Sequence, residues 1–171
     1  MKLRLIFFII IIFYSCNSKF SYITNKNDIR YKSFITDLKK EKSFVSIERK
    51  KETFYLYYPC DFSYQKSVAI NNDKIIVSLG ETSEFFIDTI SEVNNITEYT
   101  LYNDEGKAKL LKKMVNDKCL FRFQINDFDY LFLTTSTVDL NKYPLIIHNC
   151  KEKEAEMEFD ALDLKEMWSK N

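Results

Sequence analysis

Short runs of valine, isoleucine, phenylalanine and tyrosine, separated by polar residues, recur along the chain from residue 44 to residue 148. Several of these runs alternate apolar with polar residues, which is the pattern of a strand with one buried face. The repeated pattern predicts an antiparallel, β-dominated α+β domain that forms a sandwich or a partly closed barrel. The predicted strands lie at 44–49, 53–58, 67–70, 74–79, 84–90, 97–102, 118–125, 130–135 and 144–148.

Two hairpins stand out among these strands. The strand at 118–125 has Cys119, Phe121, Phe123 and Ile125 on one side and mostly polar residues on the other, and a turn near 126–129 leads to its return strand. The second hairpin has the sequence Asn-Asn-Asp at 71–73 between two strands. Asn and Asp tolerate left-handed backbone angles, so this segment is predicted to be a tight turn.

Three helices are predicted. The first covers 28–42, where Tyr31, Phe34, Ile35 and Leu38 form one apolar stripe and Asn27 or Asp28 can cap the first turn. A second, short helix is predicted at 107–115, with Leu110, Leu111 and Met114 on one side.

The apolar residues of the C-terminal segment fit both the two-residue period of a strand and the 3.6-residue period of a helix. The prediction is a strand that ends at Phe159, followed by a short helix that has Asp160 as its N-cap and ends near Lys170. Asp163 in the first turn favours this boundary through the helix dipole.

The N-terminus carries a targeting signal. Lys2 and Arg4 precede an unbroken apolar run at 5–14. A ten-residue helix is about 15 Å long and the hydrocarbon core of a bilayer is about 30 Å thick, so the run is too short to span a membrane and is typical of a signal peptide.

The segment Phe13-Tyr14-Ser15-Cys16 resembles a bacterial lipobox of the relaxed kind found in Bacteroidota lipoproteins. Ser15 matches the small residue of that motif, whereas Phe13 and Tyr14 depart from its usual pattern. The resemblance implies that residues 1–15 are a cleaved signal peptide and that Cys16 is the lipidated first residue of the mature protein. Several acyl chains together would give a stable membrane anchor.

The mature chain is then expected to have two parts. Residues 16–27 hold the lipidated Cys16 and a flexible, polar tether, and residues 28–171 form a single globular domain. In Bacteroidota lipoproteins an acidic cluster after the lipidated cysteine resembles a signal for export to the cell surface. No such cluster follows Cys16. The expected location is therefore the cell envelope, with the domain facing the periplasm.

Composition excludes several functional classes. Two glycines cannot build a dinucleotide-binding fingerprint or a phosphate-binding loop, and one histidine excludes every site that needs two imidazoles. Without Lys2 and Arg4 the mature chain carries 23 basic and 25 acidic residues, a net charge of −2. Such a domain is a poor nucleic-acid binder, and no cofactor is predicted.

Three cysteines remain once Cys16 is assigned to lipid. Cys119 lies on the apolar side of its strand, where a free cysteine behaves as a small hydrophobe. Cys60 and Cys150 each follow the end of a strand, and they are predicted to form a disulfide in an oxidising compartment. The alternative is two unrelated free thiols, because spacing does not determine connectivity.

The sequence offers weak candidates for chemistry. His148 and Cys150 lie two residues apart and could pair as base and nucleophile, or could bind a metal ion together with Cys60 and Asp61. The predicted disulfide removes both thiols from either role. Asp127 and Asp129 lie at a hairpin tip, where Asp is common for turn formation alone. We therefore assign no catalytic and no metal-binding residue.

The strand at 53–58 has aromatic or apolar residues on both faces. Tyr55, Tyr57 and Tyr58 are the candidate binding face, because exposed tyrosines suit glycan, peptide or protein ligands. The alternative is a strand buried on both faces, for example under the N-terminal helix.

Three functions follow from these observations. The favoured one is a membrane-anchored lipoprotein whose β-rich domain is a binding or interaction module, with a protein or glycan partner. The alternative is an inhibitor or immunity-type protein that neutralises a toxin or hydrolase. A small envelope enzyme ranks third, because no nucleophile–base pair or metal cluster stands out.

Overall fold

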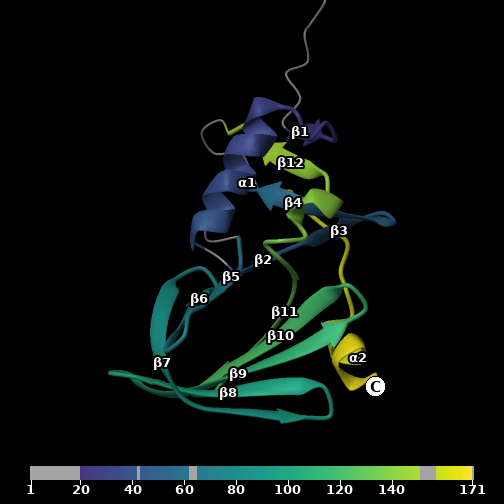
Figure 1. Cartoon of the computed structure of the whole chain (residues 1–171). Helices are drawn as coiled ribbons and strands as arrows, with labels where there is room; N and C mark the ends of the chain where they lie inside the picture. Colours follow the sequence, from purple (N-terminus) through teal and green to yellow (C-terminus); the bar gives the residue numbers. More distant parts are fainter. Residues whose placement is uncertain (1–19, 42, 62–64, 151–156, 171) are drawn as a thin grey trace, which may run out of the picture.

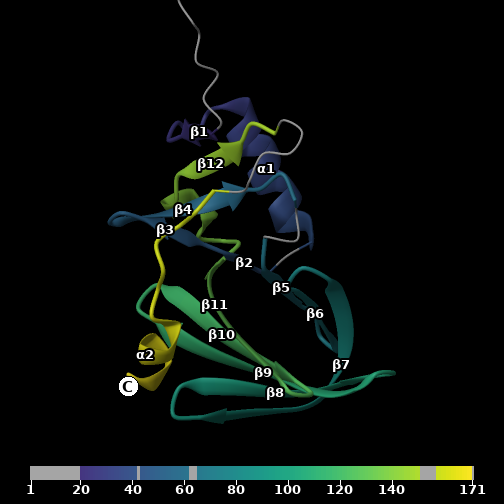
Figure 2. The same ribbon diagram turned by 180° about the vertical axis from the view of Figure 1, so that it is seen from behind.

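The computed structural model describes residues 20–41, 43–61, 65–150 and 157–170. These residues form an eight-stranded closed barrel and a separate four-stranded sheet, called here the small sheet. Figures 1 and 2 show the barrel at one end of the molecule, and the small sheet with helix α1 at the other. The predicted fold class is confirmed, and the barrel is closed rather than partly closed.

Each strand of the barrel pairs antiparallel with both of its neighbours. The order around the barrel is β10 (Lys118–Ile125), β11 (Phe128–Ser136), β2 (Phe44–Ser46), β5 (Ser67–Ile70), β6 (Lys74–Ser78), β7 (Thr82–Val93), β8 (Ile96–Asn103) and β9 (Gly106–Val115). The small sheet has the order β1 (Phe20–Ile23), β12 (Leu145–His148), β4 (Thr53–Tyr58) and β3 (Glu48–Lys50), and β12 pairs with β4 in parallel. The helical elements are α1 (Ile29–Glu41), the 3-10 turn η2 (Leu140–Lys142) and α2 (Leu164–Ser169).

Asparagines make the tight hairpin turns of the barrel. The predicted turn at 71–73 is confirmed, because the Asn71 amide donates to the Lys74 carbonyl (2.8 Å) and Ile70 pairs with Ile75. Asn94 and Asn95, between β7 and β8, both have positive φ. Positive φ at both turn residues gives the turn the same twist as the two paired strands, and Asn adopts positive φ at low cost.

Aromatic and branched side chains fill the barrel. Phe121 is fully buried and packs against Phe44 (5.1 Å between ring centroids) and Phe132 (5.7 Å). Phe85 and Phe123 make a further edge-to-face contact across the interior. The inside of an eight-stranded barrel is just wide enough for side chains to fill, and these rings occupy it.

A single run of chain joins the barrel to the small sheet. The predicted strand at 44–49 divides at Ile47, which is buried. On one side β2 pairs with β11 and β5 in the barrel, and on the other side β3 pairs with β4 in the small sheet. The Ile47 amide donates to the Leu133 carbonyl (3.2 Å), so the backbone stays hydrogen-bonded where the chain leaves the barrel.

Helix α1 confirms the helix predicted at 28–42, and it covers one face of the small sheet. The stripe of Tyr31, Phe34, Ile35 and Leu38 is buried in an apolar layer shared with the small sheet and the outer wall of the barrel. Asp28 caps the helix, because its Oδ1 accepts the Arg30 amide hydrogen (2.9 Å).

The helix predicted at 107–115 is wrong, because this segment is strand β9. It pairs along its length with β8 and β10, and Ala108 and Leu110 point into the barrel core. Met114, predicted to lie on the apolar side of the helix, is exposed. Turns on both sides bring the segment between two partner strands, and the hydrogen bonds gained there outweigh the helix propensity of its Lys, Ala, Leu and Met residues.

The C-terminal prediction is wrong in its boundaries. Residues 157–163 form no regular strand, and 151–156 lie outside the described residues. The cap of α2 is Asp163, whose Oδ1 accepts the Glu166 amide hydrogen (2.8 Å). Asp160 instead donates its own amide to the Arg49 carbonyl (2.9 Å), which holds the segment beside β3.

The predicted flexible tether is also shorter than expected. Residues 20–23 of that segment are strand β1, which pairs with β12 at the edge of the small sheet. The pattern Phe-Ser-Tyr-Ile is too short to be recognised as a strand without its partner. The predicted signal peptide at 1–15 and Cys16 lie outside the described residues. Among the residues described, no helix has the length and apolar character needed to cross a membrane.

Cys60 and Cys150 form a disulfide, which confirms the predicted pairing. The bond joins the chain just after β4 to the chain just after β12, two strands that lie side by side in parallel. Cys119 is a buried free thiol in the barrel interior, and burial raises its pKa to about 12. The disulfide indicates an oxidising, extracytoplasmic environment.

The disulfide closes a loop with a sequence separation of 90 residues. On the chain-entropy model such a bond stabilises the folded state by about 4 kcal/mol. We expect Cys60→Ser and Cys150→Ser to lower the free energy of unfolding by similar amounts, measured by urea titration, and the double variant to lose little more than either single variant. Additive losses in the double variant would contradict the bond.

Removing the Phe121 ring should leave a cavity in the barrel. Phe121→Ala is expected to lower the free energy of unfolding by about 3–5 kcal/mol, measured in the same urea titration. Phe128→Ala is the matched control, because Phe128 is largely exposed and its truncation opens no buried cavity. Equal losses in the two variants would show that Phe121 does not belong to the core.

Candidate functional site

The three tyrosines proposed from the sequence do not form one exposed face. Tyr57 is buried, and its hydroxyl accepts the Met157 amide hydrogen (3.2 Å) and lies 3.4 Å from His148 Nδ1. Tyr58 points to the other face of β4, where it packs edge to face on Phe34 of α1. Tyr55 is half-buried. The strand is thus packed on both faces, and the buried Tyr57 is not part of an exposed binding face.

The other sequence candidates have structural roles. His148 is buried between Tyr57 and the ring of Phe20 (4.7 Å between ring centroids), and Cys150 is held in the disulfide. Within the described ranges, no group of three or more His, Cys, Asp or Glu side chains is arranged to hold a metal ion.

The hairpin-tip aspartates are not a carboxylate pair. Asp129 accepts two hydrogen bonds from Arg122, from Nε at 2.9 Å and from Nη2 at 2.6 Å. The bonded guanidinium lowers the pKa of the Asp129 carboxyl. Asp127 lies in the turn between β10 and β11. Asp129 therefore holds the two strands of its hairpin together.

Four exposed aromatic residues lie at one end of the barrel, and we call them the aromatic rim. They are Phe86 (40 % exposed), Tyr102 (46 %), Phe128 (61 %) and Tyr130 (41 %). Phe86 and Tyr102 are direct partners across β7 and β8, and their rings stack with centroids 5.6 Å apart. Phe128 and Tyr130 lie two residues apart on β11 and stack at 6.0 Å.

Strand register brings the two pairs to the same end. Tyr102 pairs with Lys107, the next residue Ala108 pairs with Ile125, and Ile125 pairs with Phe128. The hairpin turns at 71–73, 104–105 and 126–127 close this end. Side chains alternate along each strand, so Phe86, which follows the core residue Phe85, lies on the outer side of the wall. Phe128, in phase with the core residue Phe132, lies on the inner side.

A cation lies over the first aromatic pair. Lys74 Nζ is 4.8 Å from the centroid of the Phe86 ring and donates to Glu84 Oε1 at 2.6 Å. The hydrogen bond to Glu84 raises the pKa of Lys74, so this amine stays charged. Flat rings beside a fixed charge can bind ligands that have both apolar and polar faces, such as sugars and protein side chains.

A second candidate is a small pocket between the barrel and the C-terminal segment. Its volume is about 200 Å³, and its charged or polar lining comes from Ser46, Glu48, Lys66 and Asp160. Apolar walls are supplied by Phe132, Leu133 and Phe159. Burial raises the pKa of the Glu48 carboxyl, and the positive charge of Lys66 opposes this shift.

Comparison of the chain with protein-family models, with curated proteins and with solved structures finds no match. Functional inference therefore rests on the geometry of these two candidate sites.

Sequence reasoning did not select the aromatic rim or Glu48. Phe128 lies in the predicted turn near 126–129, and Tyr102 is the last residue of a predicted strand, so their nearness to strand ends was the available signal. Strand register, which the sequence pattern does not determine between distant strands, is what brings the four rings to one end. Glu48 lies in a predicted strand, and its pocket depends on the C-terminal segment returning beside β3.

The raised pKa of Glu48 predicts a pH dependence of stability. The folded state holds this proton more tightly than the unfolded state, so ionisation of Glu48 costs stability as pH rises through and above its ordinary value of 4.5. The stability of Glu48→Gln relative to wild type should therefore be greater at pH 7 than at pH 4, measured by urea unfolding. Glu81→Gln, at an exposed position, is the control. A difference in unfolding free energy between Glu48→Gln and wild type that does not change with pH would contradict the raised pKa of Glu48.

Proposed function

We propose that the chain is a membrane-anchored lipoprotein whose β-rich domain acts as a binding module in the cell envelope. The aromatic rim is the observation that carries the binding part of this proposal. Four large rings remain exposed in two stacked pairs, although the barrel interior and the small sheet bury most other aromatic residues. Exposed aromatic rings offer large contact area at a low entropy cost, and they are enriched in binding interfaces.

Two independent features support an envelope location, and the first of them also supports the anchor. The lipobox-like segment ends at Cys16, and the Cys60–Cys150 disulfide fits a protein exported from the cytoplasm. Both agree with a domain that works in the envelope, facing the periplasm, where protein surfaces and cell-wall glycans are available partners.

The binding test uses two double variants in cells. Phe128→Ala with Tyr130→Ala, and Phe86→Ala with Tyr102→Ala, remove one stacked pair each without opening the core. Chemical crosslinking of the anchored protein should give a defined protein adduct, or the purified domain should co-sediment with cell-wall glycan. Truncating one important interface aromatic commonly costs more than about 1 kcal/mol, so at least one double variant should bind about tenfold more weakly or worse.

The control is Val138→Ala, which removes an exposed apolar side chain outside the rim. It should bind like the wild type, and all variants should keep the wild-type unfolding midpoint. Undiminished binding in both aromatic double variants would contradict a rim-based function. If the crosslinked partner is a toxin or hydrolase whose activity falls on binding, the protein is an inhibitor or immunity-type protein, the alternative function predicted from its sequence.

A further inference from the structure

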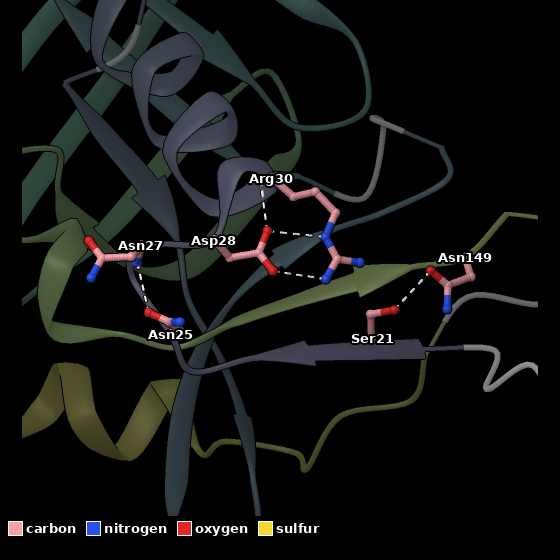
Figure 3. A network of polar contacts seen from close by, with 6 residues as sticks. All are labelled: Ser21, Asn25, Asn27, Asp28, Arg30 and Asn149. Carbon is pink, nitrogen blue, oxygen red and sulfur yellow. Dashed lines mark hydrogen bonds and ion pairs between the residues drawn. The ribbon is translucent and has the colours of Figure 1, made fainter.

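An apolar groove lies between α1 and the small sheet, far from the aromatic rim. Its volume is about 370 Å³, and its apolar lining consists of Ile29, Phe34, Tyr58 and Ile147. Ile29, at the first position of α1, is 81 % exposed. Arg30, whose guanidinium binds the Asp28 carboxylate at 2.9 Å, also lines the groove. Figure 3 shows this pair beside β12.

The groove lies next to the start of the described chain. Ile147 pairs with Tyr58 of β4 on one side and with Ser21 of β1 on the other. Ser21 also donates a hydrogen bond to Asn149 Oδ1 (3.0 Å), which joins the start of β1 to the end of β12 (Figure 3). Ile147 at the groove is therefore one strand spacing from β1, and from the start of β1 the chain leads back toward Cys16.

Chain length limits how far this end of the domain lies from the membrane. Ser21 is five residues after Cys16, and a fully extended chain covers about 3.5 Å per residue, so the backbone reaches at most about 17 Å. An anchored Cys16 lies at the bilayer surface, because its acyl chains are inserted. The edge of the small sheet, with the groove beside it, is therefore held close to the lipid headgroups.

We infer that this groove, with Ile29 at its edge, is a membrane-contacting surface that inserts into the interfacial region of the bilayer. The inference rests on the proposed lipid anchor at Cys16. An exposed isoleucine beside an apolar groove gains from contact with the acyl boundary. The polar lining of the groove, which is Ser33, Asp37 and the Arg30 paired with Asp28, can stay in the headgroup layer. The contact orients the domain with β8 and β9, and so Tyr102 of the aromatic rim, away from the membrane, because β1 and these two strands lie at opposite ends of the molecule (Figures 1 and 2).

The test measures membrane depth at two exposed positions. The full-length protein, made with its N-terminal signal, is purified in detergent and reconstituted into phosphatidylethanolamine–phosphatidylglycerol vesicles. Ile29→Trp and Val93→Trp each add one reporter, and the native Trp168 is common to both. Val93 is 64 % exposed at the end of β7, next to the β7–β8 turn in the barrel. Lipids with brominated acyl chains quench tryptophan that lies at the acyl boundary.

Quenching of Ile29→Trp, with no added quenching for Val93→Trp, is the expected result. Equal and weak quenching of both variants, in protein that co-sediments with vesicles, would overturn the inference and leave the anchor intact. A blue-shifted Ile29→Trp emission without quenching would mean that the groove holds an acyl chain of Cys16 itself, which also overturns it. Failure of the wild type to co-sediment, in the same way as Cys16→Ser, would overturn the anchor and this inference together.

Discussion

The fold depends on the short segment 44–50, which belongs to both sheets. Its first three residues form β2, the strand that closes the barrel between β11 and β5, and its last three form β3 of the small sheet. Ile47 lies between them, buried in the apolar layer that also holds α1 and the outer wall of the barrel. The barrel and the small sheet are therefore coupled by continuous backbone and a shared core, and the disulfide joins the ends of the two central strands of the small sheet.

The parts of the fold that the sequence predicts are those governed by local pattern. The stripe of α1, the alternation of β10 and the Asn-Asn-Asp turn each place their own side chains without help from distant residues. The predictions fail where contacts with residues distant in the sequence determine the structure. Residues 107–115 have good helix formers but lie between two strands, residues 157–163 are held by β3, and Phe20–Ile23 becomes a strand only because β12 is beside it. Tyr57, predicted in the binding face, is buried for the same reason, since α1 and Met157 pack on the two faces of β4.

The two candidate surfaces lie at opposite ends of the molecule and suit different tasks. The groove beside β1 is apolar and close to the proposed anchor, whereas the aromatic rim lies on strands of the barrel. A domain fixed by its lipid at one end and carrying exposed rings at the other can present those rings to partners across the periplasmic space. The pocket at Glu48 lies between these ends, where the C-terminal segment crosses from the small sheet to the barrel wall.

The intact mass of the native protein, extracted from membranes and alkylated in denaturant before and after reduction, tests this account most directly. The account predicts a chain that starts at Cys16 and carries lipid. It should take one alkyl group at Cys119 without reduction and three after reduction, when Cys60 and Cys150 are released. A chain without lipid, or one in which Cys60 and Cys150 react before reduction, would contradict an anchored, oxidised envelope protein.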